Sequence, residues 1–270
     1  MKVTIVVDNI EHAGIPGEWG FCAYIEQNGK KLLLDTGASN LFAENAEKLN
    51  IDLKDIDFAV LSHAHYDHAN GMEKFFEINR KATFYLQEGC GENCYFKKGF
   101  IRKYIGIPKG ITKKYQDRIE YVSGVYTVAD GIYLVSHSTP HLEQIGKKEM
   151  MYQKTKLGWK PDNFCHEQSL VLDTDGGLVI FNSCSHGGVV NIINEVKAAF
   201  PNKKITALIG GFHIFKHPEA EIRELAKLIK ETGIERIYTG HCSKERGYRI
   251  LREELGDMAG QFYVGMELVF

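Results

Sequence analysis

The chain has little net charge, no long hydrophobic run and no N-terminal targeting pattern. Its 33 Lys and Arg residues against 35 Asp and Glu residues leave a formal charge of -2, so no global attraction to nucleic acid or an anionic membrane is expected. The first apolar stretch is interrupted by Asp8 and Glu11, too early for a signal peptide, and no later run is long enough to span a bilayer. We expect a cytoplasmic protein with no membrane partner.

The six cysteines lack the spacing of a disulfide framework or a zinc ribbon. Three residues, not two, separate Cys90 from Cys94, and no later pair completes a four-sulfur site. Without a secretory signal, such cysteines are expected to be reduced thiols. The chain is 270 residues long, with 44% hydrophobic and 25% charged residues, which is ordinary for a globular protein. We expect one domain over residues 1–270.

What the sequence does contain is a concentration of metal-binding side chains in the stretch S-H-A-H-Y-D-H-A-N-G at residues 62–71. Buried imidazoles and carboxylates need partners, and one metal ion satisfies several of them. His63 and His65 are two positions apart, so on an extended backbone they can face the same way. Asp67 and His68 follow a bend and can address a second ion. The stretch therefore predicts a site for one or two metals.

Imidazoles with one carboxylate favour divalent transition metals over calcium or magnesium. Zinc is the first expectation, with iron, manganese or cobalt as alternatives. A histidine-rich surface loop is the competing interpretation, but such loops are usually low in complexity and lack a hydrophobic strand before them. Here the apolar run 56–61 directly precedes the motif. We therefore expect the ligands at the end of a buried strand.

Strands and helices are predicted along the whole chain. Val-, Ile- and Leu-rich runs predict strands at 3–7, 21–26, 31–35, 56–61, 81–86, 120–127, 131–136, 169–173, 178–182, 205–209, 236–238 and 261–264. Helical patterns cover 40–49, 72–78, 189–200, 218–232 and 243–255. Asn28-Gly29 marks a hairpin turn, and 120–127 is expected to pair with 131–136.

Further candidate site residues stand where predicted strands end. Asp35 could cap the helix that follows it, but we favour a role in which its carboxylate holds a metal ligand from behind. His186, His213 and His241 each follow a strand and precede a helix, so they can converge on one cleft. His137 and His141 are weaker candidates because their surroundings are predicted to be loop.

Residues 88–118 are predicted to form an irregular insertion that is both basic and aromatic. The alternatives are a solvated surface loop, a surface that binds nucleic acid, and a lid that binds an anionic, flat substrate. For the lid, the expected substrate-rim residues are Lys97, Lys98, Arg102 and Lys103.

The motif order resembles the metallo-β-lactamase superfamily, whose signature H-x-H-x-D-H follows a buried strand and precedes separate downstream ligands. The resemblance implies an α/β (α+β) fold, a four-layer αββα sandwich of two mixed sheets flanked by helices. It also implies a dinuclear site with two sets of ligands. The first metal would be held by His63, His65 and His186, and the second by Asp67, His68 and His241.

Within the superfamily, L-D-T-G, N-S-C-S-H-G-G, I-G-G-F-H and G-H-C-S look most like the dihydropterin ribofuranosyl-aminobenzene phosphate synthase group. The chain departs from that group at Ser183, where glycine is usual, and at Ser243, where threonine is usual. It also lacks the bridging aspartate that most dinuclear members carry between the third and last histidine. Cys184 is a tentative soft ligand to the second metal. We favour instead a weakly bound second metal, since Cys184 and His186 belong to one short turn.

These features predict a metal-dependent, hydrolase-type enzyme acting on a small phosphorylated, pterin-like substrate, by hydrolysis or by displacement of pyrophosphate. Asp67 would orient the attacking water, and His213 would bind substrate phosphate or transfer a proton. The alternatives are a nuclease or phosphodiesterase, and a metal or ligand sensor without catalysis, which the missing aspartate suggests. We expect a small anionic substrate and no nucleic-acid partner. A monomer and a homodimer are both compatible with the sequence.

Overall fold

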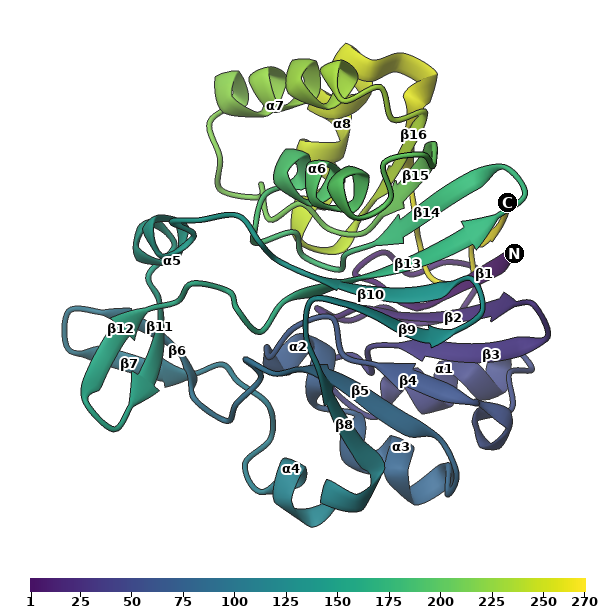
Figure 1. The fold of residues 1–270 in the computed structure, drawn as a ribbon, viewed down its shortest axis with the longest axis vertical. Coiled ribbons are helices and arrows are strands. Elements are labelled where there is room, and N and C mark those ends of the chain that lie inside the picture. The colour runs from purple at the N-terminus through teal and green to yellow at the C-terminus, as the bar shows by residue number, and fades with distance from the viewer.

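Two seven-stranded sheets pack face to face in the computed structural model, which describes residues 1–270 (Figure 1). The first sheet has the order β18-β1-β2-β3-β4-β5-β8. Its strands are β1 (Lys2–Val7), β2 (Cys22–Gln27), β3 (Lys30–Leu34), β4 (Phe58–Val60), β5 (Thr83–Gln87), β8 (Ile119–Val122) and β18 (Glu267–Val269). The run from β3 to β8 is parallel, whereas β18, β1, β2 and β3 pair antiparallel.

The second sheet is mixed in the same way, with the order β17-β16-β15-β14-β13-β10-β9. Its strands are β9 (Val125–Ala129), β10 (Ile132–Ser136), β13 (Gln168–Thr174), β14 (Gly177–Phe181), β15 (Ile205–Ile209), β16 (Arg236–Thr239) and β17 (Ala259–Gln261). Strands β14 to β17 are parallel, and the ends of β14, β15 and β16 each lead into a loop that carries a histidine. The parallel halves of both sheets therefore deliver side chains to one edge.

Helices cover both outer faces and complete the four-layer αββα arrangement that the family resemblance implied (Figure 1). The helices at the first sheet are α1 (Leu41–Lys48), α2 (Tyr66–Ala69) and α3 (Met72–Ile78), and those at the second are α6 (Val189–Ala199), α7 (Glu219–Glu231) and α8 (Lys244–Leu255). Side chains alternate along β3: Leu32 and Leu34 join the core between the sheets, while Leu33 joins the core beneath α1 and α3. Both faces are buried, which explains the continuous apolar run.

Two predicted strands are wrong in detail. Residues 120–127 do not form one strand, because the chain breaks at Ser123-Gly124 and crosses from β8 in the first sheet to β9 in the second. Gly124 adopts a positive φ of 65°, which permits the sharp crossover. The last predicted strand is replaced by β17, after which the chain returns to pair β18 with β1.

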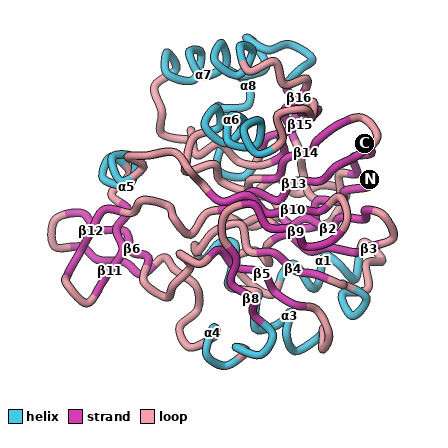
Figure 2. Tube along the Cα trace, viewed as in Figure 1, coloured by secondary structure: helices cyan, strands magenta, loops and turns pink.

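A small third sheet projects from the sandwich, with the order β12-β11-β6-β7 (Figure 2). Its strands are β6 (Cys94–Lys98), β7 (Ile101–Tyr104), β11 (Met151–Thr155) and β12 (Gly158–Pro161). The prediction of an irregular insertion is therefore wrong for residues 94–104, where β6 and β7 pair as a regular antiparallel hairpin.

Short helices complete the fold. Two are α-helical, α4 (Ile111–Lys114) and α5 (Glu143–Lys148), and four are 3-10 turns at Leu53–Asp55, Gln116–Arg118, His241–Ser243 and Gly256–Met258. None of the helices has both the length and the apolar character needed to cross a bilayer.

Candidate metal centre

The H-x-H-x-D-H motif lies directly after β4, in a buried loop that enters the short helix α2. The structure brings the six residues implied by the resemblance together in two trios. In each trio, the potential ligand atoms all lie within 4.8 Å of one another. The trios are His63, His65 and His186, and Asp67, His68 and His241. Asp67 Oδ2 is 3.5 Å from His241 Nε2 and 3.8 Å from His68 Nε2.

Asp35 holds two of the histidine rings from behind. Its Oδ2 accepts hydrogen bonds from His68 Nδ1 and from the Ser62 hydroxyl, both at 2.7 Å, and its Oδ1 accepts the Ser62 amide. The Ser62 oxygen in turn lies 2.8 Å from His63 Nδ1. This network assigns the proton of both rings to Nδ1, so that both Nε2 atoms present a free lone pair. The predicted role of Asp35 fits this geometry.

His241 is oriented by two residues that sequence reasoning missed. Asn9 Oδ1 lies 3.2 Å from His241 Nδ1, and Asp8 Oδ1 accepts the His241 amide at 2.7 Å. Asp8 and Asn9 follow β1 as Asp35 follows β3, so an acid at the end of a buried strand was the available signal. His241 has a positive φ of 44°, and these contacts hold that conformation in place.

The turn that carries His186 is held by a second missed group. Glu167 accepts the backbone amides of His186 and Gly187, each at 2.9 Å. His137 bonds Glu167 through Nε2 and Glu195 through Nδ1. Burial opposes the charge of the His137 ring, but the two carboxylates raise its pKa to about 10. His137 is therefore a cationic link behind the turn and not one of the ligands.

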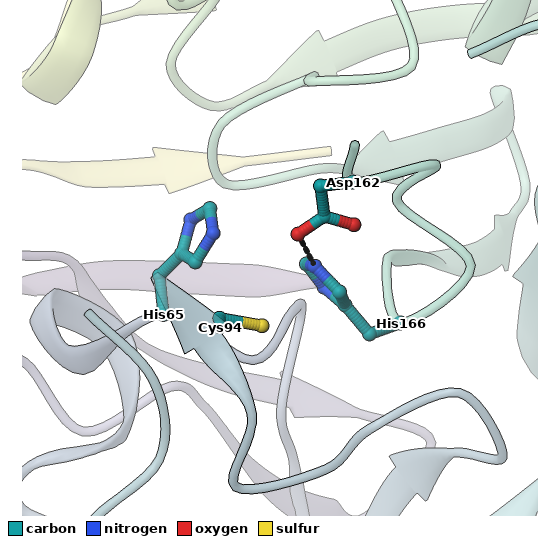
Figure 3. A group of neighbouring side chains, drawn as sticks. All are labelled: His65, Cys94, Asp162 and His166. Atoms are coloured by element: carbon teal, nitrogen blue, oxygen red, sulfur yellow. Dashed lines mark hydrogen bonds and ion pairs between the residues drawn. The ribbon is translucent and has the colours of Figure 1, made fainter. Parts of the chain in front are cut away.

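A buried Asp162–His166 pair supports the motif from another side (Figure 3). His166 Nδ1 accepts the Ala64 amide at 3.1 Å, which assigns its proton to Nε2, and Nε2 lies 3.1 Å from Asp162 Oδ2. His65 and Cys94 complete a cluster with this pair within 4.8 Å. Both nitrogens of His166 are already hydrogen-bonded, so the cluster acts as a support for the motif.

The trios have the chemistry that a transition metal requires. His63 Nε2, His241 Nε2 and both ring nitrogens of His186 are buried without a hydrogen-bond partner. Burial lowers the pKa of His63 and His186 well below the usual value and that of His65 to about 3, so these imidazoles are neutral. Three neutral imidazoles close together fit a cation in the first trio. In the second trio burial opposes the charge of His241, but Cys242 and Asp67 raise its pKa to about 9.

Two other predicted residues stand at the same centre. Cys184 Sγ lies 3.3 Å from His68 Nε2, so the turn from Cys184 to His186 reaches both trios, contrary to the expectation that it is too short. His213 belongs to neither trio. Its ring centroid lies 4.4 Å from that of His186, and its Nδ1 lies 3.9 Å from Glu149 Oε2. Burial lowers the pKa of His213 to about 4, so the ring is neutral.

A cavity of about 310 Å³ opens over the centre. Its floor includes His65, Asp67, His186 and His213. Its walls are largely aromatic and apolar, and they are formed by Trp19, Tyr66, Phe96, Ile105, Met151 and Phe215, together with Lys103. This volume is at the lower end of the range for small-molecule sites.

Only one of the four predicted substrate-rim residues of the insertion lines this cavity. Lys103 lines it, whereas Lys97 lies over the Tyr152 ring, Arg102 lies over Trp159, and Lys98 is exposed, all outside the cavity wall. The Ile105 carbonyl accepts the Tyr66 amide at 2.9 Å, which joins the insertion directly to the motif.

A cation missed by the sequence reasoning, Lys244, lies over two rings of the cavity wall. Its Nζ is 5.1 Å from the Trp19 ring centroid and 5.4 Å from that of Phe215. His141, the remaining weak ligand candidate, has an exposed side chain beside Glu143 and is in neither trio.

The fold agrees with comparisons to known proteins. The family model of the metallo-beta-lactamase superfamily matches residues 19–147. The solved structure of Tm1679, a metal-dependent hydrolase of the beta-lactamase superfamily, superposes with a TM-score of 0.84 at 27% identity, covering 100% of this chain and 99% of that one. The chain has the metallo-β-lactamase fold and is similar in sequence to that superfamily.

Two further comparisons concern a curated relative and a more distant solved structure. A curated protein of Methanocaldococcus jannaschii, 7,8-dihydropterin-6-methyl-4-(beta-D-ribofuranosyl)-aminobenzene-5'-phosphate synthase, is 28% identical over 273 residues, which is 93% of this chain and 88% of that protein. Zn(2+)-bound PqqB from Methylobacterium extorquens shares the fold, with a TM-score of 0.60 at 12% identity and full coverage of both chains. The resemblance to the dihydropterin synthase group is thereby confirmed.

Proposed function

We propose that this protein is a metal-dependent enzyme that acts on a small, phosphorylated, pterin-like substrate. The single observation that carries the proposal is the aromatic cavity placed directly over the two ligand trios. Flat rings such as Trp19 and Phe215 suit stacking with a heterocycle, and Lys103 suits a phosphate. The curated relative is named as a synthase of a dihydropterin and a phosphorylated ribofuranosyl-aminobenzene, which has the same chemical features.

The trios would hold one or two divalent transition metals, with zinc first and iron or manganese as alternatives. His63, His65 and His186 would hold the first ion, and Asp67, His68 and His241 the second. A bound ion supplies a Lewis acid and a water whose pKa falls to about 7. Asp67, at the cavity floor, orients the nucleophile, and neutral His213 accepts a proton at its free ring nitrogen.

Two reaction types remain for the same site. In hydrolysis, water attacks and the phosphorylated group leaves with the bonding electrons. In displacement, a new bond forms at the carbon that carries the diphosphate, diphosphate leaves with the electrons of the broken C–O bond, and the proton of the nucleophile passes to a base. The name of the relative supports displacement, and we give that reaction priority.

The test is incubation of metal-reconstituted protein with a dihydropterin diphosphate, with and without a ribofuranosyl-aminobenzene phosphate. Mass spectrometry of the products and release of inorganic diphosphate separate the reactions: displacement gives a joined product, and hydrolysis gives the pterin alcohol without the second substrate. His63→Ala should abolish either product. A fully metallated protein that turns over neither mixture, nor a panel of phosphodiesters, thioesters, lactones and lactams, would overturn the proposal.

A further inference from the structure

Two lysine side chains lie over one aromatic ring of the cavity wall. Lys216 Nζ is 4.8 Å from the centroid of the Phe215 ring, and Lys244 Nζ is 5.4 Å from the same centroid. Lys244 Nζ is also 5.1 Å from the centroid of the Trp19 ring. Both rings line the cavity over the candidate metal centre, so the two positive charges stand beside its wall.

Neither ammonium group forms an ion pair with an acidic side chain. The carboxylate of Glu149 faces two histidine rings instead. Glu245, which follows Lys244 in the sequence, accepts a hydrogen bond from Gln261. A ring face attracts an exposed ammonium group only weakly, and two ammonium groups near one ring repel each other. An anion bound by both lysines would offset this repulsion.

The local structure disfavours a lysine at position 244. Lys244 has a φ of 54° and a ψ of 170°, a conformation with positive φ that favours glycine. It is also the first residue of α8, where the positive end of the helix dipole repels a cation. Backbone strain at a residue other than glycine points to a use of its side chain, and here that side chain reaches two rings of the cavity wall.

Both rings also contact the candidate metal centre. The centroid of the Trp19 ring lies 5.0 Å from that of His241, which is in the second trio. The centroid of the Phe215 ring lies 5.1 Å from that of His213. Only one ring therefore separates each lysine from the centre, and a substrate group held by the lysines would leave the rest of the substrate over the trios.

We propose that Lys216 and Lys244 bind the diphosphate group of the substrate, and that Lys244 sets a preference for diphosphate over phosphate. A diphosphate has anionic oxygens at both ends, so each phosphoryl group can meet one ammonium group. Lys103 lies over a different ring, 5.9 Å from the Tyr66 centroid, and remains for the phosphate of the second substrate. The inference rests on the proposed function, in which diphosphate leaves with the electrons of the C–O bond, and the two lysines stabilise its charge as it leaves.

The first measurement is the affinity for inorganic diphosphate and for inorganic phosphate, by isothermal titration calorimetry on metal-loaded and on chelator-treated protein. We expect the wild type to bind diphosphate more tightly than phosphate. Lys244→Met should weaken the binding of diphosphate about tenfold or more, since it removes a charge-assisted contact. Lys244→Arg keeps the charge and should restore most of the affinity. Lys227→Met, which alters a lysine paired with Glu224 on α7, is the matched control and should bind diphosphate as the wild type does.

Two further readouts separate binding from a structural role. In steady-state kinetics, Lys244→Met should raise the KM for a dihydropterin diphosphate about tenfold and leave the KM for a ribofuranosyl-aminobenzene phosphate unchanged. Lys244→Gly should lose diphosphate affinity in the same way without a lower melting temperature, because glycine adopts the positive φ without strain. A lysine that only holds the two rings in place would lower the melting temperature when it is replaced by glycine.

The outcomes distinguish this inference from the proposed function. Turnover of the diphosphate substrate with the same KM and the same diphosphate affinity in the wild type and Lys244→Met would overturn the inference while the proposed function stands. Equal affinity of the wild type for phosphate and diphosphate would overturn the preference. Diphosphate binding that depends on Lys244, in a metal-loaded protein without turnover, would support the anion site and overturn the proposed function alone.

Discussion

The histidine side chains at the centre are oriented by hydrogen bonds from residues that lie outside the two trios. His68 and His63 depend on Asp35 and Ser62, and His241 depends on Asn9. Each partner contacts the Nδ1 atom of its ring and holds the ring proton there. The Nε2 atom therefore keeps a free lone pair that faces the trio even without a cation. The metal affinity that we propose would therefore depend partly on residues that do not touch the metal.

Asp35→Ala tests this dependence. Removing the carboxylate frees the His68 ring and leaves the Ser62 amide unsatisfied, so we expect the affinity for the second metal to fall about 10- to 100-fold. Competition with a chromogenic chelator measures it. Asp55→Ala, which removes an exposed carboxylate paired with Lys31, is the matched control and should not change the affinity. Equal affinities in both variants would show that Asp35 does not support the ligands.

The substitution His213→Ala separates an effect on catalysis from an effect on metal binding. Because His213 is outside both trios, the variant should retain full metal content while kcat falls about 10²- to 10⁴-fold, the usual contribution of a general acid or base. Elemental analysis and steady-state kinetics provide the two readouts. His217→Ala, a nearby histidine paired with Glu221, should keep its activity. Loss of one equivalent of metal in His213→Ala would instead make it a ligand.

Among the elements, the β6–β7 hairpin is the one that joins the projecting sheet to the site. Its end passes along the motif, where the Ile105 carbonyl accepts the Tyr66 amide, and Lys103 lines the cavity. The same hairpin carries Lys98, which is exposed near its tip. Only the base of the hairpin is therefore expected to meet the substrate.

Lys103→Met and Lys98→Met form a matched pair on this hairpin. Loss of one charge-assisted contact to phosphate should raise the KM of the Lys103 variant roughly tenfold, since such contacts contribute about 1.5–3 kcal/mol. The Lys98 variant should match the wild type. Steady-state kinetics with a phosphorylated and a dephosphorylated substrate check this, and an equal KM rise for both substrates would argue against a contact to phosphate.

For the whole molecule, the centre joins the two sheets. His63, His65, Asp67 and His68 come from the loop after β4 in the first sheet, whereas His186 and His241 follow strands of the second. A metal bound only by the folded arrangement therefore links the two halves of the sandwich.

Removal of metal should lower thermal stability. A ligand that binds only the folded state at a thousand times its Kd adds about 4 kcal/mol, so a chelator should reduce the melting temperature by several degrees. Differential scanning calorimetry with and without chelator measures the shift, and re-addition of zinc should reverse it. A His63→Ala/His241→Ala variant should show little response to chelator.

The His137 link gives the molecule a pH-dependent contribution to stability. Its pKa is raised to about 10 in the folded protein, against about 6.5 in an unfolded chain, so the folded state binds the extra proton. This contribution is complete below pH 6.5 and is lost as the pH rises toward 10. Urea unfolding across this range should show the free energy of unfolding of the wild type falling by up to about 4 kcal/mol more than that of His137→Gln. Parallel profiles would contradict the link.

Most strands and helices and the metal motif could be predicted because they depend on local patterns, whereas the four layers followed only from the family resemblance. The continuous apolar run of β3 and the H-x-H-x-D-H spacing are visible in a few residues. The residues that orient the ligands were missed because they contact residues distant in the sequence. Asn9 contacts His241, and Glu167 accepts the amides of the turn at His186. The strand break at Gly124 was missed although Ser123-Gly124 is a turn signal, because β-forming residues stand on both sides of it.

The order of the ligands along the chain has a consequence for biosynthesis. The four motif ligands leave the ribosome early in synthesis. The first trio also needs His186, and the second needs His241, which follows β16. Neither position can be filled in its final geometry while the chain is short. If the trios hold metals as proposed, loading follows synthesis of most of the chain, and a chain terminated after residue 200 would contain the ligands of the first position only.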